Sequence, residues 1–266
     1  MDELIGNFQS WYLALFLTSA RILVAFTVLP MFGQRIFPSM IRNGVMVTIA
    51  MCVVPLTHEQ VKDLPLNFPY MAFLISKEAV LGLMLGYMMS LPFWALRGAG
   101  FVMDMQRGAM SALFYSAPLS GMASPLANLF GQLAVAILFI SGGFLMLLEV
   151  LMRSYQVWPI NEFIPTFRPE ALKVILKQLD LLLYATLLIS GPFIGIMFLI
   201  DFGLGLVGRY LPQLNIFTAA MPIKSALVFF ILVIYITVIA NYLHESFVSF
   251  GTQLQLLDTL LHERLR

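Results

Sequence analysis

Long apolar stretches alternate with short polar segments along almost the entire chain, as in proteins with several membrane-spanning helices. Six apolar blocks are recognisable, at about residues 11–31, 41–56, 70–96, 126–151, 181–207 and 219–242. The second block has only about 16 residues, fewer than the about 20 that a full span needs. Pro92 is expected to kink or end the helix of the third block.

Two amphipathic patterns accompany the apolar blocks. Residues 169–180 begin with a proline, which the first turn of a helix tolerates, and they predict a short helix. In residues 246–266 the apolar side chains recur every three or four positions, which predicts a C-terminal amphipathic helix on the membrane surface or on a partner. The whole pattern predicts one all-α membrane domain over residues 1–266, built of helical hairpins with several bent or broken helices.

The stretch 97–125, between the third and fourth blocks, is too polar for a plain span and too apolar for an ordinary exposed loop. It contains Arg97, Asp104 and Arg107 among glycines, serines and prolines. Non-helical backbone and charges at membrane depth are tolerated where protein buries them or where they line a water-filled path. If residues 98–115 are helical, the three charges share a face. They indicate either a pore or gate element or a self-neutralising salt-bridge cluster.

The tip of this stretch combines bulky apolar side chains with small and turn-forming residues. The candidate gate residues are Met110, Leu113, Phe114, Tyr115, Leu119 and Met122. An apolar tip of this kind can close a pore by contact and dewetting. A packed loop explains the same composition, so both interpretations stay open here.

Further charges lie inside the apolar blocks, where an unpaired charge is costly and is expected to face protein or water. They are Arg21 in the first block, Lys77 and Glu78 at the start of the third, and Asp201 and Arg209 around the end of the fifth. We expect these charges, together with Arg97, Asp104 and Arg107, to be buried or to contact partner subunits.

Small residues and aromatic residues give two more expectations. Gly82 and Gly86 form a small-xxx-small face that permits close helix approach, either to a neighbouring subunit or within the chain. Tyr155 and Trp158 are of the kind found at membrane interfaces.

The composition agrees with an integral membrane protein: 60% of the 266 residues are hydrophobic and 11% are charged, against about 25% in soluble domains. Lys plus Arg number 15 and Asp plus Glu 14, so the chain lacks the excess of positive charge that would favour binding to nucleic acid. The single cysteine, Cys52, excludes an internal disulfide and is expected to be a small buried hydrophobe. The three histidines have no metal-ligand spacing, and no cofactor is expected. The N-terminus lacks the basic region of a cleaved signal, so the first block is expected to be retained.

The basic residues divide almost evenly between the two sides of a six-span arrangement, so the positive-inside rule assigns no orientation. An even division of basic residues is less surprising if partner subunits, rather than lipid, surround some of the helices.

No catalytic motif occurs: GxSxG, HExxH, the P-loop and the dinucleotide-binding fingerprint are all missing, and the acidic residues are dispersed. The sequence therefore predicts that the protein is not an enzyme. A self-sufficient small-molecule transporter stays open as an alternative, because broken helices and buried charges also mark that class.

Three segments resemble the export-apparatus protein of type III secretion, called SctT in injectisomes and FliR in flagella. They are RILVAFTVLPMFGQRIFP, GLMLGYMMSLPFWALRGAGFVMDMQRGAMSA and ISGPFIGIMFLIDFGLGLVGRYLPQLNIF. The run PQLNIF (212–217), followed by Pro-Ile-Lys, is the most specific. The segment LMRSYQVWPI (151–160) is more similar to the injectisome branch.

The resemblance implies a function beyond what composition gives. The family protein is a single-copy member of a helical assembly with SctR and SctS, and the assembly forms the pore through which unfolded substrate proteins enter. A part resembling SctR is fused to a part resembling SctS, and SctU and SctV are further partners. The complex belongs to the bacterial inner membrane but lies largely displaced toward the periplasmic side.

A loop of the family protein plugs the closed pore. By resemblance, this loop corresponds to about residues 108–123 of the present chain, which favours the gate interpretation of the stretch 97–125. The energy for transport is expected to come from elsewhere in the machine, so no catalytic residue is assigned.

Overall fold

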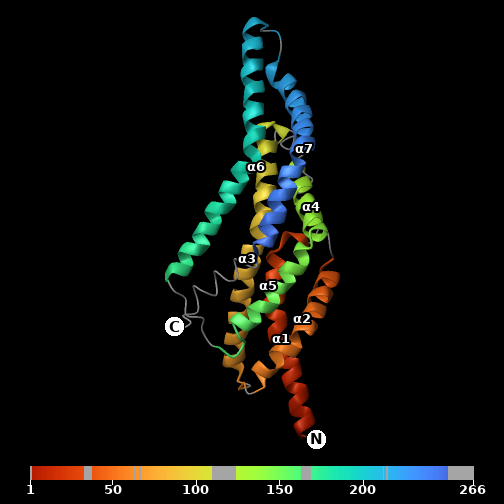
Figure 1. The fold of residues 1–266 in the computed structure, drawn as a ribbon, viewed down its shortest axis with the longest axis vertical. Coiled ribbons are helices and arrows are strands. Elements are labelled where there is room, and N and C mark those ends of the chain that lie inside the picture. The colour runs from red at the N-terminus through yellow and green to blue at the C-terminus, as the bar shows by residue number, and fades with distance from the viewer. Residues whose placement is uncertain are drawn as a thin grey trace. The chain divides into compact units, whose positions relative to one another are not determined.

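The structure is a computed structural model that describes residues 2–32, 38–62, 64–65, 67–109, 124–162, 169–211, 213 and 215–250. Its elements are α1 (Asp2–Val28), a short 3₁₀ helix η1 (Pro30–Phe32), α2 (Ser39–Val61), α3 (Phe68–Gln106), α4 (Pro125–Ile140), α5 (Gly143–Val157), α6 (Pro169–Tyr210) and α7 (Ile216–Val248) (Figure 1). Every regular element in these ranges is helical, which confirms the predicted all-α class.

Five helices in the described ranges are long and apolar enough to cross a membrane, and α4 with α5 forms a bent pair that brings the number to six if counted as one span. The five segments are Gln9–Val28, Ser39–Val61, Phe68–Gln106, Leu176–Tyr210 and Thr218–Val248. Five of the six apolar blocks therefore correspond to these helices, and the fourth block corresponds to the bent pair. The second block, which alone is marginal in length, is part of a 23-residue helix that includes Pro55.

Three helices differ in extent from the sequence prediction. α3 continues through Pro92 to Gln106, so the first ten residues of the stretch 97–125 are helical. The predicted separate helix at 169–180 is wrong, because these residues are the start of the 42-residue helix α6. The fourth block is interrupted at Gly142, whose φ of 73° lies in the left-handed region that favours glycine.

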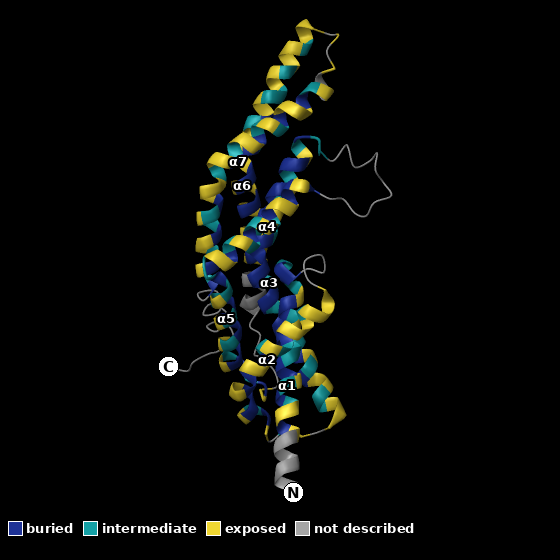
Figure 2. Ribbon diagram, turned by 90° about the vertical axis from the view of Figure 1, so that its right-hand side faces the viewer, coloured by how far each residue is buried: buried dark blue, intermediate teal, exposed yellow. Residues whose placement is uncertain are grey.

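The chain forms two compact units: unit 1 comprises residues 1–91, 142–178 and 247–266, and unit 2 comprises residues 92–141 and 179–246. In unit 1, α1 lies beside α2 in both views (Figures 1 and 2), and the pair is joined by a hydrogen bond of 2.8 Å between the Thr18 and Thr57 hydroxyls. At the same helix pair, Ser10 Oγ lies 3.0 Å from His58 Nε2, and Trp11 stacks on the His58 ring at 4.4 Å.

Two glycines bring α3 into backbone contact with α1. A Cβ at Gly82 would collide with the carbonyl oxygen of Arg21, and a Cβ at Gly86 would lie 2.6 Å from that of Ala25. Real Cβ atoms do not approach an oxygen so closely, so both positions require glycine. Of the two predicted roles for this small-xxx-small face, packing within the chain is the one that the structure supports.

In unit 2, the end of α3 packs against α4, α6 and α7. A Cβ at Gly100 would lie 2.7 Å from the Ala127 nitrogen, so α3 and α4 also meet at their backbones. Phe193 of α6 contacts Tyr235 of α7 edge to face, with ring centroids 5.5 Å apart.

Helices α6 and α7 leave much of their apolar surface uncovered in the isolated chain (Figure 2). The most apolar window of the α7 span is only 17% buried, whereas that of α3 is 67% buried. The large exposed side chains include Leu187, Phe198, Leu199, Phe202, Phe230, Val233 and Ile234. Such a surface has to be covered by lipid or by other subunits. Cys52, expected to be buried, is exposed as well.

Candidate functional site in two buried charge clusters

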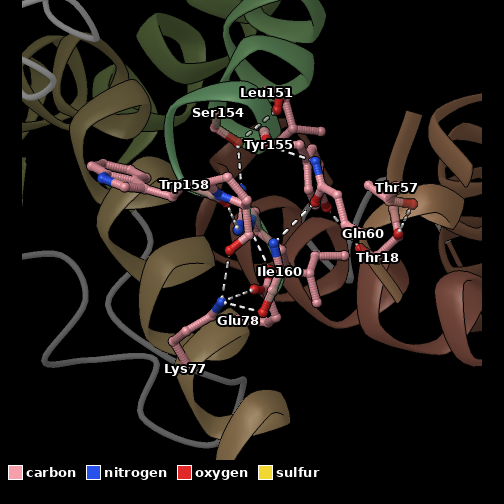
Figure 3. A network of polar contacts seen from close by, with 12 residues as sticks. Thr18, Thr57, Gln60, Lys77, Glu78, Leu151, Ser154, Tyr155, Trp158 and Ile160 are labelled. Carbon is pink, nitrogen blue, oxygen red and sulfur yellow. Dashed lines mark hydrogen bonds and ion pairs between the residues drawn. The ribbon is translucent and has the colours of Figure 1, made fainter. Parts of the chain in front are cut away.

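Unit 1 contains a buried ionic network centred on Arg21, which we call the Arg21 cluster (Figure 3). Arg21, from the C-terminal half of α1, and Glu78, from α3, are both fully buried. The Arg21 Nε atom donates a hydrogen bond of 2.7 Å to Glu78 Oε2. Its Nη1 donates to Ser154 Oγ at 3.1 Å and its Nη2 to the Trp158 carbonyl at 2.9 Å. One guanidinium thus joins α1, α3 and the end of α5.

Lys77 extends the Arg21 cluster beyond the end of α5. Its Nζ donates to the carbonyl oxygens of Pro159, Ile160 and Glu162 at distances of 2.9 to 3.1 Å, and it lies 3.0 Å from Glu78 Oε1. Carbonyl groups at and after a helix C-terminus lack helical partners and carry partial negative charge, so cations stabilise them. Two cations and one carboxylate therefore fix the end of α5 against α1 and α3.

Neutral polar groups complete the Arg21 cluster. The Tyr155 hydroxyl donates to the Thr18 carbonyl at 2.8 Å, and its ring centroid lies 4.1 Å from the Arg21 Cζ atom, a cation–π distance. The Gln60 amide donates to the Tyr155 carbonyl and accepts from the Ile160 nitrogen. The three guanidinium nitrogens and the ammonium group all have acceptors. The geometry is that of a restraint between helices, with no group poised for a reaction.

Unit 2 contains a second network at the end of α3, the Asp104 cluster, formed by Asp104, Arg107, Ser124 and the nitrogen of Leu126. Asp104 is fully buried, and its Oδ2 accepts hydrogen bonds from Ser124 Oγ and, at 2.8 Å, from the Leu126 nitrogen. Its Oδ1 lies 2.6 Å from Arg107 Nη2, one helical turn later. The carboxylate therefore binds both chain ends that flank residues 110–123.

The sequence explains how this cluster forms. Ser124 is the N-cap of α4, with its Oγ accepting from the Ala127 nitrogen at 3.2 Å and with Pro125 at the first helical position. A carboxylate near a helix N-terminus is favourable because of the exposed N–H groups there. At the other end, Gly108 has a φ of 81°, which terminates α3 in the left-handed conformation common after helices.

A third set of contacts involves Asp201. Its Oδ1 lies 2.5 Å from Lys224 Nζ of α7, and the same Nζ donates to the Gln106 carbonyl at 3.2 Å. Arg209, two turns after Asp201 on the same helix, is exposed. Within the chain, the counter-ion of Asp201 therefore comes from the neighbouring helix α7.

The predicted site residues have different environments. Arg21, Lys77, Glu78, Asp104 and Arg107 are buried within the chain, whereas Asp201 is half-buried. Arg97 is exposed and its side chain lies against Gly131 of α4, so the expected face shared with Asp104 and Arg107 contains only the latter two. Contacts of exposed Arg97 and Arg209 with partner subunits stay predictions.

All six candidate gate residues lie outside the described residues, as does 251–266, the greater part of the predicted C-terminal helix. The gate residues concerned are Met110, Leu113, Phe114, Tyr115, Leu119 and Met122. The structure therefore characterises the two anchors of this segment, at Asp104–Gly108 and Ser124–Leu126.

Several residues of the two clusters were not singled out from the sequence or were assigned elsewhere. Tyr155 and Trp158, expected at a membrane interface, are buried within the chain. The Tyr155 hydroxyl donates to the Thr18 carbonyl of α1, and the Trp158 carbonyl accepts from Arg21. Ser154 contacts Arg21 across 133 residues, and such a separation leaves no local signal. The Ser-Pro pair at the start of α4 is a signal that could have identified Ser124 as a cap.

No group of three or more potential metal ligands occurs among the described side chains. The Arg21 cluster combines cations with a carboxylate and backbone carbonyls, and the Asp104 cluster combines a carboxylate with a cation, a hydroxyl and a backbone nitrogen.

Comparisons with known proteins agree with this picture. Residues 12–250 match the family described as bacterial export proteins, family 1. The chain is 36% identical over 216 residues to the Yop proteins translocation protein T of Yersinia pestis, covering 81% of this chain and 82% of that protein. It is 32% identical over 241 residues to the secretion system apparatus protein SsaT of Salmonella typhimurium, covering 90% and 93%. The flagellar biosynthetic protein FliR of Bacillus subtilis is 30% identical over 241 residues, covering 90% of each chain.

Proposed function

Because this chain belongs to the bacterial export proteins of family 1, we propose that it forms, with SctR and SctS, the pore through which unfolded substrate proteins enter the type III secretion pathway. The chain is a subunit of the export apparatus, a structural component and not an enzyme. The injectisome branch is favoured over the flagellar one, in agreement with the higher identity to the Yersinia and Salmonella proteins than to FliR.

The similarity over residues 12–250 is the observation that carries the proposal, and the fold supports it. The apolar side chains left uncovered on α6 and α7 form a large surface that partner subunits would bury. SctR and SctS are the proposed neighbours, with SctU and SctV as further partners and membrane lipid covering the rest. One part of the chain would resemble SctR and the other SctS.

Several apolar helices in an export-apparatus protein indicate the bacterial inner membrane. We place much of the fold on the periplasmic side. The 39 residues of α3 and the 42 of α6 support this placement, because each helix has about twice the residues that a single span needs.

The loop over about residues 108–123 is the proposed plug of the closed pore. Its two ends are held together by the buried Asp104 carboxylate, which contacts Arg107 on one side and Ser124 and Leu126 on the other. Fixed ends are what a plug needs, since a loop with free ends would not hold apolar side chains against a moving substrate.

The test is to replace Ser111–Met122 by a glycine–serine segment of equal length in cells that assemble the apparatus. Small-ion leak, substrate secretion and co-purification of SctR and SctS are then recorded. We expect increased leak with the assembly intact, because the replacement keeps the loop length but removes its apolar side chains. An unchanged leak with normal secretion would make residues 110–123 a packed loop and would locate the seal in another subunit.

Co-purification also tests the assembly itself against the alternative of a self-sufficient small-molecule transporter. A pore subunit should be recovered with SctR and SctS, and deletion of its gene should abolish secretion. Recovery as a stable species without them, or secretion that persists after deletion, would contradict the proposed function.

A further inference from the structure

Lys224 connects three helices of unit 2 at the point where α3 ends. It is 7% exposed, and its ammonium group lies 2.5 Å from the Asp201 carboxylate of α6 and 3.2 Å from the Gln106 carbonyl of α3. Gln106 is the last residue of α3, so its carbonyl lacks a partner within the helix. A lysine is well suited to this position, because it satisfies that carbonyl and complements the negative helix end.

Two other residues of α7 make further contacts with the end of α3. The Met221 side chain lies one turn before Lys224, and its Cε atom is 3.0 Å from where a Cβ on Gly108 would be. The Arg107 guanidinium carbon lies 5.9 Å from the Phe229 ring centroid, also on α7. Three consecutive residues of α3 and its C-terminal turn, Gln106 to Gly108, therefore contact α7.

The contacts at the two ends of residues 110–123 differ in kind. The Ser124 end is held by Asp104 of α3, whose carboxylate accepts hydrogen bonds from Ser124 and Leu126 at the start of α4. The Gln106 end is held by a charge from α7 that is neutralised by a carboxylate of α6. A movement of α7 against α6 would therefore reach the end of α3, and Lys224 is the side chain that links α7 to both α6 and α3.

We propose that Lys224 is a positioning residue that fixes the end of α3 to α6 and α7 and so sets the position of Gly108 and Ala109, which precede the segment 110–123 in the sequence. An effect of Lys224 on ion leak rests on the proposed plug function of residues 110–123. An effect of Lys224 on the position of Gly108 and Ala109 does not depend on that function, so the positioning role and the plug function can be tested separately.

The test uses labelling of a cysteine at Ala109, which is half-buried beside Gly108. The background is Cys52→Ala, because Cys52 is the single cysteine of the chain and is exposed. The labelling rate of Ala109→Cys with a water-soluble maleimide is measured in the complex with its partner subunits, together with ion leak. Lys62→Met, which removes an exposed lysine paired with Glu59, is the matched control.

Lys224→Met is expected to raise the labelling rate several-fold and to increase leak. Lys224→Arg should keep the labelling rate and the leak at their parental values, since arginine can reach the same two oxygens. The pair Asp201→Leu with Lys224→Met removes both charges of the α6–α7 ion pair, so that neither is left unpaired, and offers no donor to the Gln106 carbonyl. Labelling should therefore stay raised in this double variant. A return to the parental rate would assign the effect of Lys224→Met to the unpaired Asp201 carboxylate alone and overturn the role at α3.

Lys224→Gln serves if Lys224→Met does not assemble, because it is polar and still lacks the charge that binds Asp201. A parental labelling rate in every assembled neutral variant would overturn the proposal. If replacing Ser111–Met122 causes no leak but Lys224→Met still raises labelling, the positioning role holds and the plug function fails. If that replacement causes leak and the neutral variants label normally, the plug holds and the positioning role fails.

Discussion

Glycines at individual positions determine how closely the helices of this protein approach one another. Gly82 and Gly86 place α3 directly on the backbone of α1, and Gly100 does the same between α3 and α4. Other glycines have open surroundings: nothing lies within 4 Å of a Cβ built on Gly44 or on Gly191. The sequence alone did not distinguish these two groups, because a glycine pattern is the same whether its neighbour is the same chain, a partner or lipid.

The difference predicts opposite effects of alanine at two helical positions. Gly86→Ala would place a methyl group 2.6 Å from the Ala25 carbonyl oxygen and force α1 and α3 apart, at a cost of about 1–3 kcal/mol. Gly44→Ala meets nothing and should be neutral or stabilise α2 by about 0.5–1 kcal/mol. The thermal unfolding midpoint of the purified complex measures both. Equal midpoints for the two variants would contradict the close approach.

At the scale of elements, the Arg21 cluster joins α1, α3 and the end of α5 by charge. Breaking a buried ion pair by removing one partner costs about 3–5 kcal/mol, while replacing both by apolar groups is often neutral. Glu78→Leu should therefore lower the unfolding midpoint and the yield of assembled complex strongly, because Arg21 and Lys77 are then buried without a carboxylate. Arg21→Met combined with Glu78→Leu should recover part of the loss.

Yield and unfolding midpoint, compared between the single and double variants, check this prediction. The surface pair Glu149 and Arg153 is the control, with its 2.6 Å ion pair and both side chains 56% exposed. Exposed pairs contribute about 0–1 kcal/mol, so Glu149→Leu should have little effect. A Glu78→Leu variant as stable as Glu149→Leu would show that the cluster does not restrain the helices.

The sequence predicted the helical class and the apolar blocks well, because a run of about 20 mostly apolar residues is the pattern of a membrane-spanning helix. It left open whether Pro92 kinks or ends the third helix. α3 continues through this proline, as membrane helices can when packed neighbours compensate for the hydrogen bond that proline removes. The sequence did not locate the break at Gly142, because glycine is also common inside membrane helices. The charged residues of the site were visible as anomalies, but partners such as Ser154 and Lys224 depend on contacts more than a hundred residues apart.

At the scale of the whole molecule, the apolar surface of α6 and α7 predicts that the chain depends on its partners. Produced alone, it would expose side chains such as Phe198, Phe202 and Phe230, which favours aggregation or degradation. Co-production with SctR and SctS should raise the monodisperse yield several-fold, measured by size-exclusion chromatography of a fluorescently tagged chain in detergent. An unchanged yield would indicate that lipid alone covers this surface.

The Arg21 cluster also has a consequence for synthesis at the ribosome. Glu78 is translated 57 residues after Arg21, and the Trp158 carbonyl follows 137 residues after it. At about 5–20 residues per second, the last acceptor becomes available roughly 7 to 30 s after the arginine. Until Glu78 has been synthesised, a lone arginine near the centre of a helix opposes insertion by about 2.5–3.5 kcal/mol. The first helix to be synthesised, α1, is therefore among the last to reach its final position, because that position depends on the completion of α5.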